Sequence, residues 1–548
     1  MKLAYLFLFL LFSANLALGI PVEGHKMMVA APTQLAIPVG QKIAKMGGNV
    51  VDVAVAVELT LSVTSPYFAS LGGGGFAMVR MNNAEPVAVD FRETAPILTH
   101  PGFYKDRPEK ASIVGPLAVA TPGIPMGLWE LHKKYGKLKW KQLFEDPIRL
   151  AEQGFPISGD WVRDTEETKN DFNASGKKYF FKNGQSYKAG EILRQPQLAK
   201  ALKKLRDEGI KSFYGGDIGK DIVATLKKPG GVIAIQDLQN YKVRWLTPIK
   251  KDFMGHTVYM MPPPSSSGVL TSGILGLIEK TEMTKKAPAS AEESHLLAEI
   301  FKFAFRGRSL LGDPDFNKNP VIELTSDSYL KNLASLISSK KTVQLKPLTD
   351  ELLAKESTET TNFTVMDADG NTVVMTITLN GTYGSAMVSD KYGIALNNEM
   401  DDFTTIIDKP NMYGLIQGKA NDVRAGKRPL SSMSPTIITK NNKTVVGVGG
   451  AGGPRIITGV FQSWYRVVAN GYNMDRAIQT PRIHHQFLPD TLFVDEYQFS
   501  RDTQNALEKM GHKTQVSWTT KVNGIHLRDD GILEGAYDSR SEGGAGGI

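Results

Sequence analysis

Cysteine is absent from all 548 residues of the chain. Its absence excludes disulfide bonds, a thiol nucleophile, an iron–sulfur cluster held by thiolates and a lipid-modified N-terminal cysteine. Blocks of one charge are lacking as well. The formal net charge is +8, but lysine and arginine are scattered, with doublets such as Lys227-Lys228 and Lys340-Lys341. This pattern is typical of a solvated surface and argues against a basic stripe that would bind nucleic acid.

Long apolar runs are missing after the N-terminus, where no stretch reaches the roughly 18 uninterrupted apolar residues that a membrane span needs. The N-terminus itself has one lysine, an apolar run from Leu3 to Phe12, and small residues at Ala17 and Gly19. This order predicts a secretory signal peptide over residues 1–19, cleaved after Gly19. An uncleaved anchor is the alternative, but the run is short for it. We therefore expect a soluble periplasmic or secreted protein without a membrane anchor.

Apolar content is sufficient for a large folded body. Hydrophobic residues make up 41% of the chain and charged residues 22%, which is typical of a globular protein. At this length the chain can form two or more domains or one large α/β body. A helical pattern over residues 27–65 breaks at Gly47-Gly48 and resumes at Asn49. It leads to the glycine run Gly72–Gly75, where a tight turn is favoured over a phosphate-binding loop because neither nucleotide motif matches.

Residues 360–380 have the pattern of a β-hairpin. Asp369-Gly370 is a turn signal, and the runs on either side alternate polar residues at even positions with apolar residues at odd positions. Apolar side chains of paired strands must share a face, so the loop must have an odd length. A loop of three or five residues places Thr360 opposite Thr378, with Asn380 further along the same face. The alternative interpretation is a solvent-facing threonine ladder, which also stabilises strand pairs.

Acidic and hydroxyl side chains follow the hairpin. Glu399, Asp401 and Asp402 lie close together after a predicted buried strand. They form either a surface acidic turn or a set of carboxylates for a metal or an ammonium group. The histidines lack the spacing of metal ligands, so we predict no metal site. Ser431 and Ser432 present paired hydroxyls before another predicted strand.

Two further motifs could bind negative charge. Residues 445–461, VVGVGGAGGPRIITGVF, are predicted to form a strand, a glycine-rich turn and the start of a helix. The backbone N–H groups of such a turn could bind an anion or a developing oxyanion. Arg92 follows a predicted strand in VDFRETAP, where its guanidinium could hold a carboxylate through two hydrogen bonds.

Together these motifs resemble those of the γ-glutamyltranspeptidases. The resemblance runs from about residue 27 to residue 548 and rests on SLGGGGF, FRETAP, MPPPSSSG, GDPDF, TTNFT, TLN, NNEMDDF, KRPLSSMSPT, GGAGGPRII and PRIHHQF, in this order. Several of these stretches are long and uncommon, which makes the match specific. Asn362 and Phe363 depart from the histidine-tyrosine pair that is more usual after the two threonines, and we do not expect this to affect catalysis.

The resemblance implies an α+β fold, the four-layer αββα sandwich of the N-terminal-nucleophile hydrolases. It also implies a proenzyme that cuts itself before a threonine. The matching bond is Glu359-Thr360, which would give a large subunit, residues 20–359, and a small catalytic subunit, residues 360–548, associated as a heterodimer. Once Thr360 is N-terminal, its α-amine, with a pKa of about 7.7–8.0 for such groups, can act as the general base without a histidine.

The same resemblance implies a role for each site residue. Thr360 would be the nucleophile and Thr378 would hydrogen-bond to it. The backbone N–H groups of Gly452 and Gly453 would form the oxyanion hole.

Substrate-binding roles follow in the same way. The substrate's α-carboxylate would be held by Arg92, Ser431 and Ser432, and its α-ammonium by Asn380, Glu399 and Asp402. Tyr413 would be the aromatic residue of a lid loop over residues 406–423. No cofactor is implied.

The implied activity is that of a γ-glutamyl transferase and glutathione hydrolase. Glutathione or another γ-glutamyl compound would acylate Thr360, and water or the amine of an amino acid or peptide would take the acyl group. One alternative is an acylase of the same superfamily that acts on glutaryl or cephalosporin side chains, which would leave Glu399 and Asp402 without an ammonium partner. The other is a periplasmic binding protein that is never processed.

Overall fold

The computed structural model describes residues 19–346, 360–406, 411–412, 415, 418–496 and 499–548. Three predictions concern residues outside this set, namely the first 18 residues of the signal peptide, Glu359 of the scissile bond, and Tyr413 of the lid loop. Within the described part of the chain, no helix is both long enough and apolar enough to cross a membrane.

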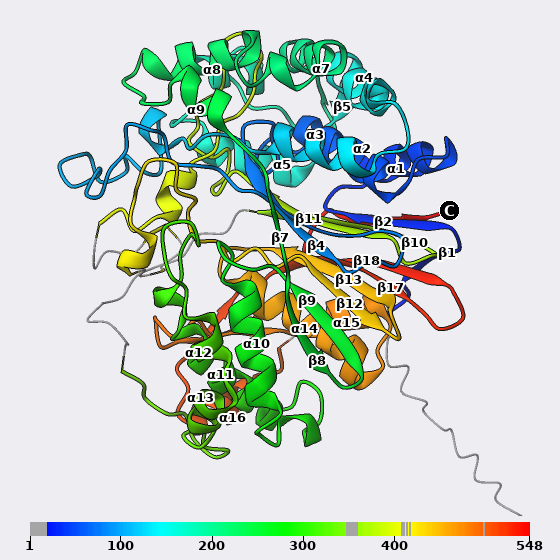
Figure 1. Cartoon of the computed structure of the whole chain (residues 1–548), viewed down its shortest axis with the longest axis vertical. Helices are drawn as coiled ribbons and strands as arrows, with labels where there is room; N and C mark the ends of the chain where they lie inside the picture. The colour runs from blue at the N-terminus through cyan, green and yellow to red at the C-terminus, as the bar shows by residue number, and fades with distance from the viewer. Residues whose placement is uncertain (1–18, 347–359, 407–410, 413–414, 416–417, 497–498) are drawn as a thin grey trace, which may run out of the picture.

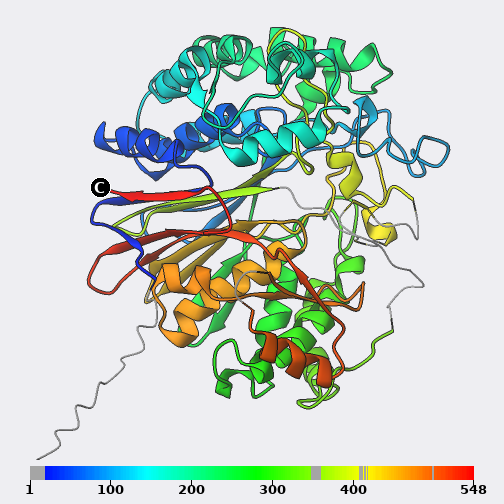
Figure 2. The ribbon, with the colours of Figure 1, turned by 180° about the vertical axis from the view of Figure 1, so that it is seen from behind.

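Two seven-stranded antiparallel sheets lie face to face at the centre of the molecule (Figures 1 and 2). The first, here called the β10 sheet, has the order β19 (Gly544–Gly547), β2 (Met27–Ala31), β10 (Thr361–Asp367), β11 (Thr372–Thr378), β3 (Gly74–Arg80), β4 (Val87–Phe91) and β7 (Arg244–Leu246). The second, the β13 sheet, has the order β1 (Val22–Gly24), β18 (Leu533–Tyr537), β17 (Lys521–Leu527), β13 (Lys443–Ala451), β12 (Thr436–Lys440), β9 (His256–Met260) and β8 (Ile249–Phe253). Outside them are a small sheet of β14 (Ile483–His484), β15 (Leu492–Asp495) and β16 (Thr514–Ser517), and a ribbon of β5 (Phe155–Pro156) and β6 (Ile192–Leu193).

Helices cover the outer face of each sheet, so the molecule has four layers (Figure 1). The β10 sheet is covered by α1 (Ala36–Lys45), α2 (Val50–Thr64), α3 (Ile124–Tyr135), α4 (Glu145–Gln153), α5 (Gly159–Thr168), α6 (Ala174–Phe180), α7 (Pro196–Glu208), α8 (Asp217–Lys227) and α9 (Ile235–Asn240). The β13 sheet is covered by α10 (Ser267–Ile278), α11 (Ala291–Phe305), α12 (Val321–Thr325), α13 (Asp327–Ala334), α14 (Arg455–Asn470), α15 (Met474–Gln479) and α16 (Arg501–Lys509). The predicted α+β fold, an αββα sandwich, is confirmed.

The innermost helix of the first layer, α2, shows how the sequence specifies an element. Asn49 caps it by accepting hydrogen bonds from the backbone N–H groups of Val51 and Asp52, at 3.0 and 3.1 Å. Every residue of α2 is buried, as its alanine- and valine-rich composition predicts. The helical pattern predicted to open at residue 27 is wrong for Met27–Ala31, which form β2 between β19 and β10. A short apolar run cannot be assigned to helix or strand by periodicity alone.

The hairpin has the register predicted from its alternation. Thr361 pairs with Ile377 and Met366 with Thr372, and continuing this register by one residue places Thr360 opposite Thr378. The apolar odd positions, among them Phe363 and Met375, belong to the hydrophobic core that α2 shares.

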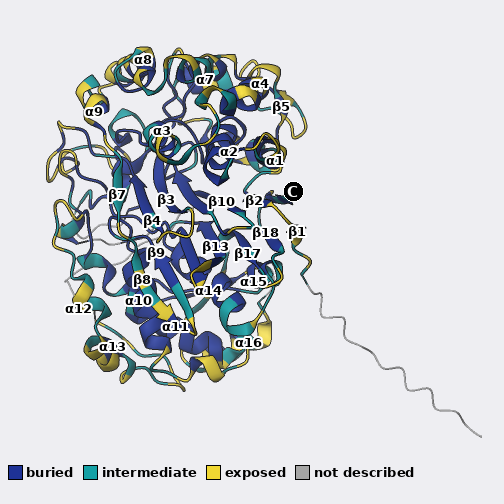
Figure 3. Cartoon of the chain, turned by 45° about the vertical axis from the view of Figure 1, so that its right-hand side comes forward, coloured by how far each residue is buried: buried dark blue, intermediate teal, exposed yellow. Residues whose placement is uncertain are grey.

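The polar face of the hairpin is buried between the two sheets. Thr364, Thr372 and Asn362 each expose 0% of their surface, and β10 and β11 lie against β13. Glycines in β13 make room for them, because a β-carbon on Gly447 would lie 3.0 Å from the methyl carbons of both Thr364 and Thr372. A solvent-facing threonine ladder, the alternative interpretation, is therefore wrong. Figure 3 shows the same arrangement, with buried strands at the centre and exposed residues on the outer helices.

Both sheets combine strands from the two sides of residue 360. In the β10 sheet, β10 and β11 lie between β2 and β3, and in the β13 sheet, β12 pairs with β9. The C-terminal strand β19 pairs with β2 at the edge of the β10 sheet (Figure 1). The residues before and after 360 thus form one body, not two separate domains.

The glycine run Gly72–Gly75 leads into β3 and fits closely against the strands around it. A β-carbon on Gly73 would lie 2.2 Å from the carbonyl oxygen of Thr378, and one on Gly75 would lie 2.3 Å from that of Thr376. These distances are too short for real atoms, so glycine lets β3 approach β11. The predicted tight turn is found only at the start of the run, where Gly73 N donates to Ser70 O at 3.0 Å, because Gly74 and Gly75 belong to β3.

Candidate active site

Thr360 lies at the end of an inner strand, where both sheets present polar groups. It directly precedes β10 and exposes 8% of its surface. It borders a pocket together with Ala451 and Gly452 of the glycine-rich turn. On the neighbouring strand, the Thr378 hydroxyl oxygen accepts a hydrogen bond of 2.7 Å from the backbone N–H of Asn380. The pairing of Thr360 with Thr378 thus lies next to the turn that was predicted to hold an oxyanion.

That turn joins β13 to α14. Gly452 and Gly453 have φ values of 134° and 54°, which favour glycine because other residues are strained there. Their carbonyl oxygens accept hydrogen bonds from Arg455 N and Ile456 N. The N–H groups of the turn lie at the N-terminal end of α14, where the helix dipole favours negative charge. The geometry suits the predicted oxyanion site.

Arg92 lies in a buried cluster of charges just after β4. It exposes 1% of its surface, and its Nη1 lies 2.6 Å from Glu399 Oε2. Its Nη2 donates a hydrogen bond to Asp402 Oδ2. Burial raises the pKa of both carboxyl groups, and the charge of Arg92 opposes this rise. Arg92, predicted to hold a carboxylate, therefore forms ion pairs with Glu399 and Asp402, predicted to hold an ammonium group, and these residues are here called the charged cluster.

A second arginine in this cluster was missed by the sequence analysis. Arg308 follows α11, exposes 4% of its surface, and donates a hydrogen bond of 3.2 Å from Nη2 to Ser432 Oγ. Burial lowers the pKa of Arg308 to about 10, against the attraction of Asp402. In the sequence Arg308 is a basic residue just after the segment that forms α11, and no local pattern links it to Ser432.

Glu93, the neighbour of Arg92 in FRETAP, was also missed as a site residue. It is fully buried, and neither of its carboxylate oxygens has a hydrogen-bond partner among the described residues. Burial raises the pKa of Glu93 to about 8, although Arg92 opposes the rise. A β-carbon on Gly74 would lie 2.4 Å from the Glu93 carboxyl group. Since Gly74 pairs with Thr378, Glu93 connects the charged cluster to the hairpin.

Ser431 and Ser432 are held by the loop after β9, which contains the sequence MPPPSSSG. The N–H of Ser431 donates to Pro264 O at 2.7 Å, and the N–H of Ser266 donates to Ser431 O at 2.8 Å. Two loops that are far apart in sequence therefore hold the segment whose Ser432 hydroxyl lies beside Arg308.

Asn380 and the acidic turn contact the described part of the predicted lid loop. Asn380, in the left-handed region with φ 74°, donates from Nδ2 to Asn398 O at 3.0 Å. Asp401 accepts hydrogen bonds from Met412 N at 2.8 Å and from the Ser112 hydroxyl at 2.7 Å. Its carboxyl group thus has a structural role, and burial raises its pKa to about 6.

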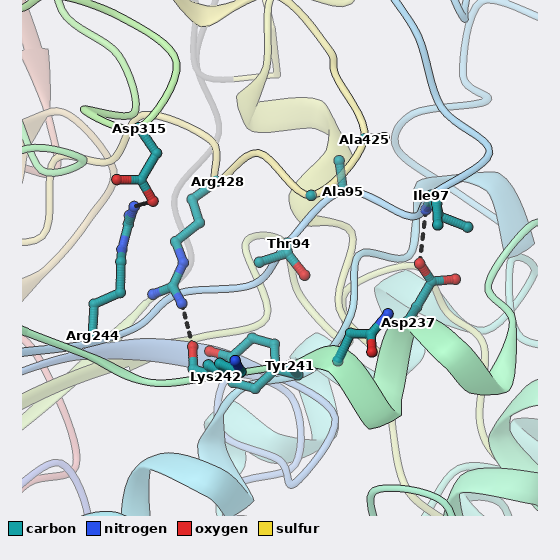
Figure 4. Close-up of a pocket in the computed structure, with 12 residues that line it drawn as sticks. Thr94, Ala95, Ile97, Asp237, Tyr241, Lys242, Arg244, Asp315, Ala425 and Arg428 are labelled. Atoms are coloured by element: carbon teal, nitrogen blue, oxygen red, sulfur yellow. Dashed lines mark hydrogen bonds and ion pairs between the residues drawn. The ribbon is translucent and has the colours of Figure 1, made fainter.

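A separate pocket of about 450 Å³, lined in part by Thr94 and Ala95, contains none of the predicted site residues (Figure 4). Its two arginines, Arg244 and Arg428, are both ion-paired with Asp90 on β4. Asp90 also accepts a hydrogen bond of 2.9 Å from the backbone N–H of Arg92. This network supports the end of β4, from which Arg92 reaches the charged cluster.

A threonine at the start of an inner strand of an αββα sandwich, beside a glycine turn and a threonine neighbour, defines the class of N-terminal-nucleophile hydrolases. Residues 36–548 match the model of the family described as Gamma-glutamyltranspeptidase. The chain belongs to the γ-glutamyltranspeptidase family, and the resemblance seen in the motifs is confirmed.

Curated relatives match along nearly the whole chain. The glutathione hydrolase proenzyme of Escherichia coli (strain K12) is 40% identical over 533 residues, which cover 95% of this chain and 91% of that protein. The glutathione hydrolase proenzyme of Bacillus subtilis (strain 168) is 33% identical over 96% of this chain and 92% of that protein.

Solved structures agree with the fold. A cephalosporin acylase from Bacillus halodurans superposes with a TM-score of 0.87 and 25% identity, covering 96% of this chain and 97% of that chain. The γ-glutamyltranspeptidase of Helicobacter pylori is 35% identical with a TM-score of 0.56, covering 58% of this chain and 95% of that chain.

Proposed function

We propose that this chain is a self-processing γ-glutamyl transferase and glutathione hydrolase with Thr360 as its nucleophile. The observation that carries the proposal is the position of Thr360 at the start of β10, opposite Thr378 and beside the Gly452 turn. At the ends of the next strands, β3 and β4, lie Glu93, Arg92 and the residues that pair with them.

The first step is cleavage of the Glu359-Thr360 bond. The Thr360 hydroxyl attacks the carbonyl carbon of residue 359, and water then cleaves the resulting ester, leaving a carboxylate on Glu359 and an amine on Thr360. Before cleavage this nitrogen is a non-basic amide. Afterwards it can accept the hydroxyl proton of Thr360 itself, so maturation creates the general base.

In turnover the γ-carbonyl of the donor is attacked by the Thr360 hydroxyl. The oxyanion that develops is held by the backbone N–H groups of Gly452 and Gly453, an arrangement whose single donors contribute about 3 to 4 kcal/mol in other enzymes. The released amine leaves an acyl-enzyme, and water or an acceptor amine regenerates Thr360.

Recognition of the γ-glutamyl head group is assigned to the charged cluster. Arg92, Ser431 and Ser432 hold the α-carboxylate, with Arg308 as a second guanidinium beside Ser432. Asn380, Glu399 and Asp402 hold the α-ammonium. A zwitterion suits this cluster because each of its charges meets an opposite charge in a buried setting. Tyr413, outside the described residues, is assigned to a lid over the site.

The two fragments are assigned as residues 20–359 and 360–548, after removal of a signal peptide that directs the chain to the periplasm or outside the cell. The sharing of both sheets between the fragments supports their association as a heterodimer. The size of the H. pylori chain, which matches 58% of this one, fits a separate large subunit.

An acylase for glutaryl or cephalosporin side chains is the second candidate, supported by the likeness to the B. halodurans structure. Such substrates have no α-ammonium group, so the buried carboxylates of Glu399 and Asp402 would gain no positive charge from the substrate beside that of Arg92. Hydrolysis rates of a γ-glutamyl anilide and its glutaryl analogue separate the two, and faster hydrolysis of the glutaryl compound would contradict the γ-glutamyl assignment.

Processing gives the most direct test. The unprocessed chain of 59.9 kDa should disappear from a denaturing gel in favour of two fragments, with Thr360 as the first residue of the smaller one by N-terminal sequencing. Thr360→Ala should remain a single band and show no anilide turnover. A wild-type chain that stays uncut would instead support the non-processed binding protein.

A further inference from the structure

The charged cluster lies on only one side of Thr360. In the order β2, β10, β11, β3, β4, the nucleophile is at the end of β10 and Arg92 at the end of β4, on the β11 side. A pocket borders Thr360 on the other side, toward Pro32 after β2 and Glu542 before β19. None of the residues assigned to the γ-glutamyl head group lines this pocket.

The pocket is built from aromatic and charged side chains. Tyr67 and Phe68 contribute packed rings, with centroids 4.2 Å apart. Trp518 forms the wall nearest the oxyanion turn, because a β-carbon on Gly452 would lie 2.7 Å from its ring. The charged residues that line the pocket are Lys521, Asp160 and Glu542.

Lys521 is the cation of this pocket that lacks a carboxylate partner. It begins β17 and pairs with Ala451, the residue before Gly452. Its Nζ lies 5.9 Å from the Trp518 ring centroid, and no carboxylate of the described residues is within ion-pairing distance of it. The acids nearby are already engaged. Asp160 and Asp164 pair with Arg163 at 2.6 and 2.9 Å, and Glu542 accepts from Asp160 N at 3.3 Å. Lys521 interacts with Asp164 only through the longer-range attraction of their charges.

The chemistry of the reaction places the leaving amine on the side of Thr360 that faces this pocket. At the acyl carbon the glutamyl chain extends toward Arg92, so the scissile nitrogen and its substituents must extend away from it. The leaving group of a γ-glutamyl peptide is an amino acid or dipeptide, which ends in a carboxylate. Attack of an acceptor amine on the acyl-enzyme is the reverse of the step in which the leaving amine departs. The acceptor amine therefore occupies the position that the leaving amine has left.

Resting on the proposed function, we propose that this pocket is the subsite of the leaving and accepting amine and that Lys521 binds its carboxylate. The acceptor nitrogen attacks the ester carbon, the bond to Thr360 Oγ breaks, and the proton lost by the amine passes to that oxygen. Trp518 and Phe68 pack against the apolar part of the acceptor. The enclosed void is only about 20 Å³, room for about one water molecule, so most of the acceptor lies outside this void.

The test compares two acceptors that differ only at the carboxylate, glycylglycine and glycylglycinamide, with a γ-glutamyl anilide as the donor. In the wild type the KM of glycylglycine should be about tenfold lower than that of the amide, as expected for one charge-assisted contact. In Lys521→Gln this preference should disappear through a higher KM for glycylglycine alone, and Lys521→Arg should restore it. Lys443→Gln, at the far exposed end of β13, is the matched control and should behave as the wild type.

The outcomes are separable from those of the proposed function. The leaving group of the anilide has no carboxylate, so hydrolysis of the anilide does not depend on Lys521. If the wild type did not hydrolyse the anilide, the proposed function itself would be overturned. Normal hydrolysis combined with equal KM values for the two acceptors in the wild type would overturn the Lys521 proposal alone, and this comparison needs no variant. The Lys521 proposal would also be overturned if Lys521→Gln hydrolysed the anilide normally and kept its preference for glycylglycine.

Discussion

At the scale of single residues, Glu93 is a carboxyl group whose surroundings differ strongly from water. It is fully buried, and its pKa is raised from 4.5 to about 8. Below pH 4.5 both the folded and the unfolded chain hold this proton. Between pH 4.5 and 8 only the folded chain holds it, so the contribution of Glu93 to the free energy of unfolding falls as the pH rises and is lost above pH 8.

Glu93→Gln should remove this dependence because glutamine stays neutral. In the uncut Thr360→Ala background, the two proteins should be equally stable near pH 4, and Glu93→Gln should become the more stable one toward pH 8. The gap should grow by up to about 1.4 kcal/mol per pH unit, as measured by urea unfolding at each pH. Glu109→Gln, at an exposed position, is the control, and a gap that does not change with pH would contradict the assignment.

At the scale of elements, the site is assembled by loops that meet from distant parts of the chain. The turn after α11 supplies Arg308, and the loop before β12 supplies Ser432, which accepts its hydrogen bond. These loops come from opposite sides of the proposed cleavage site. Head-group binding therefore depends on how α11 packs beneath the β13 sheet.

Arg308→Met should raise the KM of a γ-glutamyl anilide by about ten- to a hundredfold while changing kcat less. A hydrogen bond to a charged group contributes about 1.5 to 3 kcal/mol. Here the hydrogen bond from Arg308 orients Ser432, which is assigned to the α-carboxylate of the substrate and not to the reacting carbonyl. Steady-state kinetics on the processed enzyme measure this. Arg306→Met is the matched control, since Arg306 donates to Lys346 O instead. A fall in kcat at constant KM would show that Arg308 acts on the reacting atoms and not on the head group.

At the scale of the whole molecule, the shared sheets make the two fragments one folding unit. The large fragment alone would leave β2, β3 and β9 without a neighbouring strand, and the small fragment alone would do the same to β10, β11 and β12. Exposed strand edges are unfavourable. The processed fragments should therefore co-elute in size-exclusion chromatography at about 60 kDa or a multiple of it, and separate only in denaturant. Elution of the smaller fragment by itself from native buffer would contradict this arrangement.

Much of the hairpin and of the glycine turn could be predicted from the sequence, because their signals are local. Alternation and an odd loop fixed the pairing of Thr360 with Thr378, and the strand–glycine–helix pattern located the turn at Gly452. Local patterns were less informative for Met27–Ala31, since a short apolar run fits a helix or a strand equally well, and only pairing with β10 and β19 makes it a strand.

The sequence by itself determined the register of the hairpin through periodicity, and it predicted Thr360 as the nucleophile through motifs that resemble one family. Only the tertiary structure decided that the polar face of the hairpin lies between the sheets and that Arg92 pairs with Glu399 and Asp402. It also decided that Arg308 bonds to Ser432 and that Lys521 lines a pocket with Thr360. Each of these contacts joins residues that are far apart along the chain. Such contacts depend on how the sheets pack, and no local pattern encodes that packing.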